Sequence, residues 1–168
     1  MRIFGWIALL ALLTGLTAGA EERKPNTLTA REISDGSHCN SGIFFRSNLN
    51  EFENGYEDQI RNEWEGDDRT KPVDFGTGAI YRRQAARKVV SSDHEWFTMT
   101  LIANGLHFSS WVNGYMVADF TDTRPIDESN ARKGARTKPG CLSFQGHDTD
   151  GDLSFRNIRV AEMTVAKP

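Results

Sequence analysis

A set of side chains in this sequence has the chemistry of a carbohydrate site. Aromatic rings stack on the C–H face of a pyranose, while carboxylate, amide and guanidinium groups match neighbouring hydroxyls. Alternation along predicted strands would put the set on one face, if the strands share one sheet. Its members are Arg46, Glu57, Gln59, Tyr81, Arg83, His107, Trp111, Gln145 and His147. The alternative is an outer sheet face with ordinary cross-strand pairs.

The elements that must position these residues have the pattern of β-strands. Apolar and polar residues alternate between Glu95 and Phe120, and this region contains the pairs Asn104-Gly105 and Asn113-Gly114. Asn-Gly favours the positive φ angles of tight hairpin turns, so the region predicts a three-stranded meander. Further strands are predicted at 42–46, 56–61, 78–83, 141–145 and 153–160. The sequence therefore predicts an all-β sandwich or barrel of antiparallel strands.

The composition excludes several classes of protein. A chain of 168 residues allows one domain, or two at most. It has 20 Lys and Arg against 23 Asp and Glu, and a net charge of −3 gives no reason to expect nucleic acid as a partner. The 2 cysteines cannot form a tetrahedral zinc site alone or a dense disulfide framework. Stability must come mainly from a hydrophobic core.

The first twenty residues have the pattern of a cleavable secretory signal peptide. Arg2 precedes an apolar stretch from Ile3 to Leu13, and small residues end at Ala18-Gly19-Ala20. The alternative, a retained membrane anchor, needs about 20 apolar residues, and small and polar residues interrupt the stretch. We expect a signal peptide at 1–20, a lead-in at 21–27, one sandwich domain at 28–168, a periplasmic or secreted location, and no stable membrane insertion after cleavage.

Three further features leave alternatives open. Export would place Cys39 and Cys141 in an oxidising compartment, where a bond between them would close a loop of about 100 residues, but the sequence does not show that they meet. Asp148-Thr-Asp-Gly-Asp152 resembles a calcium loop, yet Asp150-Gly151 also suits a hairpin turn, which we favour over a metal site. The basic loop 121–140 is either a rim over the site or a disordered connection.

Several literal motifs occur in a fixed order along the chain. They are Asn40-Ser-Gly-Ile-Phe-Phe-Arg-Ser47, Gly55-Tyr-Glu-Asp-Gln-Ile60, Gly76-Thr-Gly-Ala-Ile-Tyr-Arg-Arg-Gln84, Trp111-Val-Asn-Gly-Tyr115, Asp122-Thr-Arg-Pro125, Gln145-Gly-His-Asp148 and Phe155-Arg-Asn-Ile158. Together, over about residues 28–163, they resemble the 3-keto-disaccharide hydrolase family, also described as 3-keto-glucoside 1,2-lyases and 3-keto-2-hydroxy-glucal hydratases. The resemblance implies a concanavalin-like jelly roll, in which two antiparallel sheets expose one face to carbohydrate.

The N-terminus departs from that family. Members usually begin with a strand pair carrying a Leu-Phe-Asn-Gly-like start and a Trp, whereas here the predicted signal peptide runs almost directly into residues 28–34. Part of the usual N-terminal strands is therefore expected to be absent, which would expose a sheet edge and puts catalytic competence in question.

The resemblance implies elimination from a 3-keto-glycoside. Oxidised carbon 3 makes the hydrogen on carbon 2 acidic, a base removes it, the aglycone leaves carbon 1, and water then adds. The chemistry requires a base, an acid and donors to the enolate oxygen, with no cofactor. For base and acid, the candidates are Glu57, His107 and His147; for the enolate, Arg46 or Arg83; for positioning the ring, Gln59, Tyr81, Trp111 and Gln145.

Structural roles are the alternative for these residues. Either histidine can be hydrogen-bonded structure, Glu57 can pair with Arg61 or Arg83, and Trp111 can pack on Tyr115 beside a turn. The sequence thus leaves two functions: an exported enzyme acting on 3-keto-glycosides, or a non-catalytic carbohydrate-binding module of the same fold.

Overall fold

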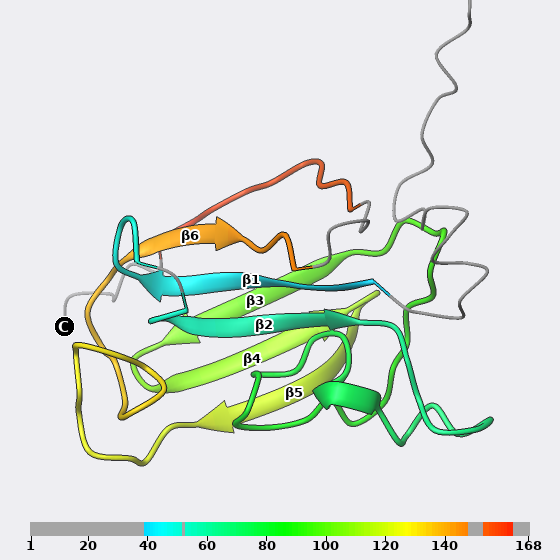
Figure 1. Cartoon of the computed structure of the whole chain (residues 1–168), viewed down its shortest axis with the longest axis horizontal. Coiled ribbons are helices and arrows are strands. Elements are labelled where there is room, and N and C mark those ends of the chain that lie inside the picture. Colours follow the sequence, from blue (N-terminus) through cyan, green and yellow to red (C-terminus); the bar gives the residue numbers. More distant parts are fainter. Residues whose placement is uncertain (1–38, 52, 148–152, 163–168) are drawn as a thin grey trace, which may run out of the picture.

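Two antiparallel sheets form the protein, seen here in a computed structural model that describes residues 39–51, 53–147 and 153–162 (Figure 1). The first sheet has the order β2-β1-β6, with β1 at Asn40–Ser47, β2 at Tyr56–Arg61 and β6 at Cys141–Phe144. The second has the order β3-β4-β5, with β3 at Met99–Asn104, β4 at His107–Val112 and β5 at Tyr115–Thr121.

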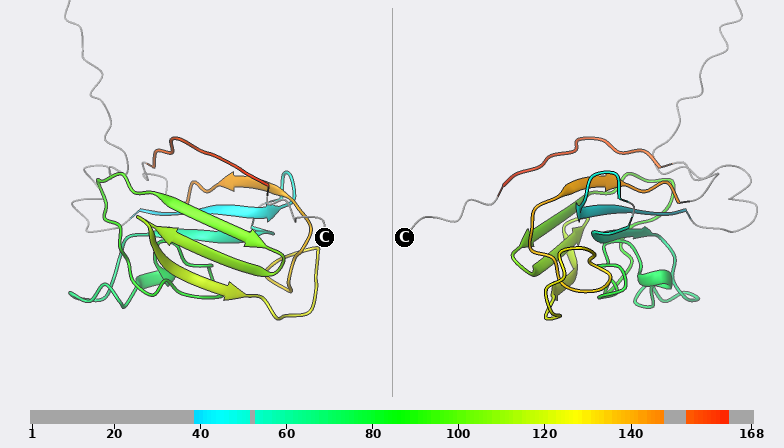
Figure 2. Two further views of the ribbon diagram at one scale, coloured as in Figure 1. Left: turned by 180° about the vertical axis from the view of Figure 1, so that it is seen from behind. Right: turned by 60° about the vertical axis from the view of Figure 1, so that its left-hand side comes forward.

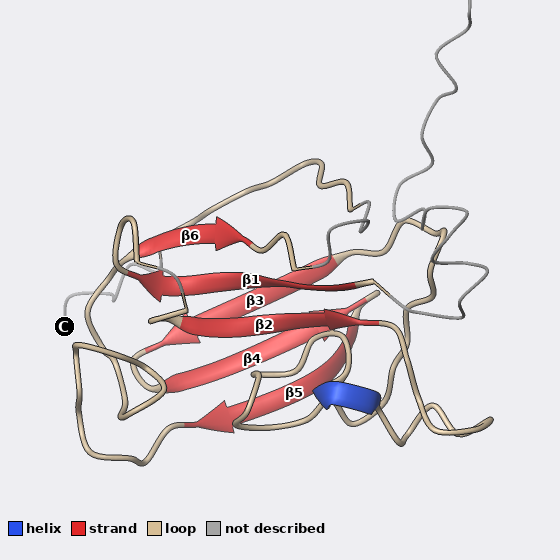
Figure 3. Ribbon diagram, in the orientation of Figure 1, coloured by secondary structure: helices blue, strands red, loops and turns tan. Residues whose placement is uncertain are grey.

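The two sheets lie in separate layers, as the side views make clear (Figure 2). Among the described residues the only helical element is a short 3-10 turn, η1, at Val73–Phe75 (Figure 3). No helix in this described part is long and apolar enough to cross a bilayer. The predicted all-β sandwich of two antiparallel sheets is confirmed.

The predicted meander is also present, as the second sheet. Val112 pairs with Tyr115, and the two residues between them, Asn113 and Gly114, have φ angles of 51° and 79°. Both signs fit a type I′ turn, the type that matches strand twist. At the other hairpin Asn104 itself pairs with His107, and the turn begins at Gly105 with a φ of 56°. The first Asn-Gly pair is thus shifted by one residue relative to its turn.

The core lies between the sheets and combines rings from both. Phe108 of β4 contacts Phe45 of β1 and Tyr56 of β2, with ring centroids 5.3 Å and 4.5 Å away. Ile80 and Ala118 pack in the same cluster and are fully buried. Aromatic contacts of this kind contribute stability beyond that from the apolar area they bury. This cluster therefore holds the two layers together.

Two predicted strands are absent from the described part of the chain. Residues 78–83 do not form a strand: Ile80 makes single bridges to Asp58 and Gln84, and the chain then turns, with Arg82 at a φ of 57°. This left-handed residue ends the alternation, because a strand needs extended backbone. The predicted strand at 153–160 is not formed either, since the described residues 153–162 have no strand pairing.

The two cysteines do not form the disulfide considered above. Cys39 immediately precedes β1, whereas Cys141 pairs with Ser47 at the far end of that strand. A strand of this length spans about 25 Å, and a disulfide needs Cα atoms within about 7 Å. The predicted signal peptide at 1–20, the predicted lead-in at 21–27 and the loop 148–152 lie outside the described residues.

Candidate functional site

The residues predicted to share one face are divided between two sheets. In β2, Tyr56, Asp58 and Ile60 point between the layers, and Asp58 accepts a hydrogen bond from Ser110 of β4 at 3.1 Å. Alternation therefore turns Glu57 and Gln59 to the outer face of the first sheet. His107 and Trp111 alternate with the core residues Phe108 and Val112, so they lie on the outer face of the second sheet. The assumption of a single shared face was wrong.

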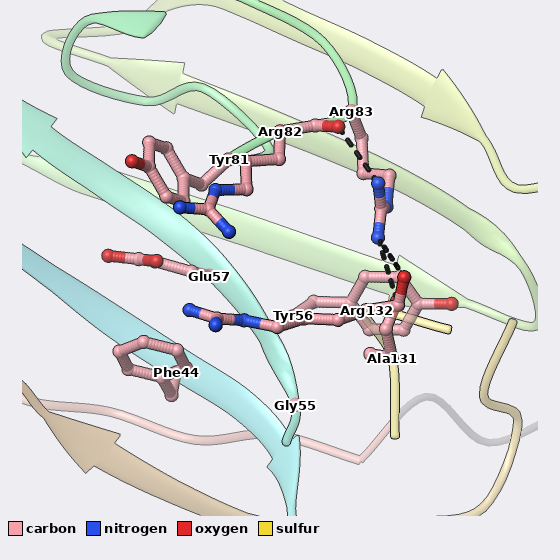
Figure 4. Close-up of a pocket in the computed structure, with 9 residues that line it drawn as sticks. All are labelled: Phe44, Gly55, Tyr56, Glu57, Tyr81, Arg82, Arg83, Ala131 and Arg132. Carbon is pink, nitrogen blue, oxygen red and sulfur yellow. Dashed lines mark hydrogen bonds between the residues drawn. The ribbon is translucent and has the colours of Figure 1, made fainter. Parts of the chain in front are cut away.

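A small pocket surrounds Glu57 on the outer side of the first sheet. Figure 4 shows the carboxyl of Glu57 between the guanidinium groups of Arg82 and Arg132, with the rings of Tyr81 and Phe44 on either side. Tyr81 comes from the segment that hydrogen-bonds to β2, since its N–H donates to the Glu57 carbonyl at 2.9 Å. Arg132 belongs to the basic loop 121–140, so part of this loop does form a rim of the pocket.

Glu57 is in an environment that disfavours its charge. Only 7% of the residue is exposed. Burial, with a smaller repulsion from Glu53 and Asp74, raises the pKa of Glu57 to about 7, although the positive charges of Arg132 and His147 act in the opposite direction. A carboxyl with a pKa near neutrality is suited to both accepting and donating a proton.

A glycine in the neighbouring strand makes room for this carboxyl. Gly42 lies in β1, and a Cβ atom there would be 2.4 Å from Oε1 and 2.7 Å from Cγ of Glu57. Such contacts are too close for any side chain. The glycine of the Asn40-Ser41-Gly42 motif therefore leaves the space that the Glu57 side chain occupies.

Gln59 is held beneath the surface by Asp74. Its side-chain nitrogen Nε2 donates to Oδ2 and to the carbonyl oxygen of Asp74, at 3.1 and 3.2 Å, and lies 3.3 Å from Oδ1 of Asn40. Asp74 adopts a left-handed conformation, with φ 46° and ψ 48°, inside η1. Only 1% of Gln59 is exposed, which leaves it almost no surface for a ligand.

Gln145 and His147 continue the same face beyond β6. Gln145 donates its backbone N–H to the Gly42 carbonyl at 2.9 Å, which extends the register of β6 along β1 and puts Gln145 on the side of Gln59. Both Gln145 and His147 line a second cavity, of about 100 Å³, with Asn40 and Phe155. His147 is exposed and close enough to Glu57 to affect its charge.

The structure separates the remaining predicted residues from Glu57. The Nε2 atom of His107 lies 2.6 Å from Oδ1 of Asp119, and this pair is exposed on the second sheet, as is part of Trp111. Arg46 occupies a bulge of β1 with a φ of 54°; its guanidinium donates to the Arg136 carbonyl at 2.7 Å and lies 5.1 Å from the Phe108 ring centroid. These three residues are not assembled with the pocket.

Arg83 lines the pocket, and its guanidinium stabilises the neighbouring loop. Its Nη2 donates to the carbonyl oxygens of Ala131 and Arg132, each at 3.0 Å (Figure 4). These bonds fix the loop that carries Arg132. The same loop is anchored from within, where Asp122 accepts hydrogen bonds from Tyr56 at 2.7 Å and from Arg124 at 2.6 Å.

Sequence reasoning missed several residues of the site. Strand alternation assigns Arg82 to the opposite face from Tyr81, but the turn at residues 81–83 brings both to the pocket. Phe44 and Arg132 line the pocket from two other segments, and Asp74 binds Gln59 from η1. Local periodicity holds no signal for such contacts between distant segments. Among the described residues no cluster of three or more His, Cys, Asp or Glu could hold a metal ion.

Residues 25–161 match the family model described as the 3-keto-alpha-glucoside-1,2-lyase-like domain. The chain belongs to this family. The match covers most of the chain and includes every described strand of the sandwich as well as the pocket around Glu57. No curated protein shows a significant match to the chain. The resemblance drawn from the ordered motifs is confirmed, and the 3-keto-alpha-glucoside-1,2-lyase-like domain has a carbohydrate as its expected ligand.

Proposed function

We propose that this protein cleaves 3-keto-glycosides by elimination across carbons 1 and 2, followed by hydration. The observation that carries the proposal is the position of Glu57, whose carboxyl has a pKa raised to about 7 and faces a pocket with two guanidinium groups. A base of this strength beside positive charge suits the removal of a hydrogen next to a ketone. The family of the chain supports the same substrate class.

In the elimination step, Glu57 removes the hydrogen from carbon 2. The electrons of the broken C–H bond move toward the carbon 3 oxygen, where Arg82 and Arg132 stabilise the negative charge. The bond between carbon 1 and the leaving oxygen then breaks, and His147 supplies a proton to that oxygen. We assign the enolate to Arg82 and Arg132 because their guanidinium groups flank the Glu57 carboxyl, although Arg132 also pairs with Glu53. Arg46 and Arg83 instead donate hydrogen bonds to backbone carbonyls.

Hydration reverses the direction of proton transfer. Water attacks carbon 1 of the unsaturated ketone and releases a proton to His147, while Glu57 returns its proton to carbon 2. Both residues are then ready for another turnover, and the net reaction is hydrolysis. The half-buried ring of Tyr81 offers a stacking surface for the sugar, and its edge-on contact with Phe75, with centroids 5.2 Å apart, fixes the ring orientation.

A non-catalytic carbohydrate-binding module of the same fold is the second candidate. The low exposure of Glu57 favours it, because a binding module needs only the rings and guanidinium groups at the surface. The two candidates predict different effects of the same substitution, since only the enzyme requires a proton acceptor at residue 57.

The test is aglycone release from a 3-keto-glucoside by the wild type and two variants. Glu57→Gln keeps the shape of the side chain but removes the base, so we expect kcat to fall by at least about 100-fold. His107→Ala removes the histidine on the far sheet and is the matched control, expected to keep nearly full activity. Sugar binding by the wild type without release of aglycone would instead favour the binding module.

We also propose that the protein is exported, to the periplasm or the exterior, because residues 1–20 have the charge and apolar pattern of a signal peptide. A carbohydrate from outside the cell is then the substrate. Its aglycone and sugar configuration would be found by comparing glycosides.

A further inference from the structure

The orientation of the Gln59 side-chain amide is fixed by its neighbours. Oδ2 and the carbonyl oxygen of Asp74, together with Oδ1 of Asn40, all lie within 3.3 Å of Nε2. Each of these atoms is an acceptor, and exchanging the amide nitrogen for the oxygen would bring acceptor against acceptor. The amide nitrogen therefore faces Asp74, and Oε1 faces away from it.

The oxygen of this amide has no hydrogen-bond donor. Oε1 of Gln59 is buried and finds no partner among the described residues. A buried acceptor without a donor is costly, and such atoms in folded proteins usually have a functional reason. Because Gln59 is 1% exposed, a substrate cannot contact it directly, so the donor is either a buried water or a neighbouring side chain.

Glu57 is the neighbour in position to supply that donor. It lies two residues before Gln59 in β2, on the same face. Gly42 is the cross-strand partner of Gln59, and the Glu57 carboxyl occupies the space where a side chain of Gly42 would begin. Directly opposed residues have Cβ atoms about 5 Å apart, so this carboxyl lies beside the side chain of Gln59.

We propose that Gln59, oriented by Asp74, accepts a hydrogen bond from the protonated carboxyl of Glu57 and thereby keeps the proton on that group. Gln59 and Asp74 are positioning residues in this inference, since neither touches the substrate. The proposal deepens the function proposed above: the proton taken from carbon 2 stays on Glu57 until it is returned in the hydration step.

Other charged groups act on Glu57 as well and must be separated from this hydrogen bond. Glu53 precedes β2 and Asp74 lies in η1, and both favour the protonated form; Arg132 in the loop 121–140 and His147 after β6 favour the ionised form. Arg82 lines the same pocket. The variants below therefore distinguish loss of the acceptor from loss of charge.

The experiment is a pH titration of the Glu57 carboxyl by NMR, with 13C-labelled glutamate side chains and no ligand. Gln59→Met removes the acceptor with little change of size, and we expect the proton affinity of Glu57 to fall about 3- to 10-fold. In this variant Asp74 keeps its negative charge but loses the hydrogen bonds from Gln59. An effect of charge alone would therefore raise the proton affinity of Glu57. The sign of the change thus separates the two causes.

Gln145→Met is the matched control. Gln145 lies across Gly42 from Gln59 and also has a buried Oε1 without a partner among the described residues, but the structure shows no side-chain hydrogen bond that orients its amide. We expect its loss to leave the Glu57 titration unchanged. A larger fall in Gln145→Met than in Gln59→Met would overturn the proposal.

Asp74 gives a second test that protects against misfolding of the first variant. Glycine and asparagine both accept the left-handed backbone of Asp74. Asp74→Asn removes the charge but keeps one oxygen to accept from Gln59, whereas Asp74→Gly removes both. We expect the proton affinity of Glu57 to be about 3-fold lower in Asp74→Gly than in Asp74→Asn.

Equal affinities in these two variants, or an unchanged titration in a folded Gln59→Met, would contradict the proposal. The titration needs no substrate, so it stands apart from the proposed catalysis. If Gln59→Met shifts the Glu57 titration but the wild type releases no aglycone, the hydrogen bond from Glu57 to Gln59 is supported and the proposed enzymatic function is not. If the wild type releases aglycone but Gln59→Met leaves the titration unchanged, the enzymatic function is supported and the hydrogen bond is not.

Discussion

Glu57 illustrates how the chemistry of one residue depends on its surroundings. The sequence indicates a carboxylate on a strand face, and nothing local distinguishes it from the other acidic residues of the chain. The structure buries this carboxyl beside Glu53 and Asp74, so that its pKa rises, while Arg82 and Arg132 supply positive charge where an enolate would form. Charge-disfavouring burial next to a cluster of donors is typical of catalytic positions.

Gly42 determines where the Glu57 carboxyl can lie. Gly42→Ala adds a Cβ that would overlap Oε1 and Cγ of Glu57, so the whole Glu57 side chain must move away. Because misplacing a catalytic group by about 1 Å costs up to about 100-fold in rate, we expect kcat/KM for a 3-keto-glucoside to fall about 10- to 100-fold. The close contact should also cost about 1 to 3 kcal/mol of stability, so activity is measured at a temperature at which the variant is folded.

Gly146→Ala is the control for that measurement. Gly146 lies beyond β6 near the same face and does not have a positive φ, and a Cβ added there would meet no described atom within 4 Å. The activity of this variant should match the wild type. Full activity in Gly42→Ala would show that the position of Glu57 does not limit the reaction.

Among the elements, the sequence predicted those strands and turns that depend on residues adjacent in the chain. Alternation and turn residues located β1, β2, β6 and the meander, and the outward side of Glu57 and Gln59 in β2 follows from period two. Strand alternation failed as a prediction at residues 78–83. Ile80 pairs with β2, but the backbone of Arg82 is left-handed and ends the extended segment. Alternation also could not show that β2 and β4 belong to different sheets, because pairing between distant segments leaves no local signal.

The contact between β2 and β4 carries a prediction on stability. Asp58 is fully buried between the sheets, and burial raises its pKa to about 7 even though hydrogen bonds from Ser110 oppose this. Between about pH 4 and pH 7 the folded state therefore holds a proton that the unfolded state has lost, and the free energy of unfolding falls as pH rises through this window.

Asp58→Asn removes that dependence. Urea unfolding at pH 5 and pH 8 should show that the wild type loses stability toward pH 8, by about 2.5 kcal/mol from Asp58, and that the variant loses much less. Glu57 contributes in the same direction, so Glu57→Gln in parallel isolates its share. An equal loss in the wild type and Asp58→Asn would show that Asp58 is not protonated in the fold.

At the scale of the whole molecule, one face of the first sheet carries the site and the second sheet supports it. Glu57 and Tyr81 line one pocket, Gln59 lies buried on the same side of β2, and His147 and Gln145 lie on the same face. His107 and Trp111 do not, because their strand lies in the other layer. Loop residues such as Arg132 come to the pocket through tertiary contacts, which the local sequence pattern does not reveal.

Export is a property of the whole chain and has its own test. The proposed signal peptide predicts that protein recovered from the periplasm or the medium begins at Glu21, by N-terminal sequencing or intact mass. A control lacking residues 2–20 should remain in the cytoplasm. Recovery of the unprocessed full-length chain from the cytoplasm alone would contradict the proposed export.

Cleavage by this protein should require a ketone at carbon 3 of the sugar, and a matched pair of substrates tests this requirement. The purified protein is incubated with a 3-keto-glucoside and with the same glucoside carrying a hydroxyl at carbon 3, and the released aglycone is quantified. We predict release from the 3-keto-glucoside only, because elimination by Glu57 requires the acidified hydrogen on carbon 2. Equal release from both, or release from neither, would contradict the proposed elimination.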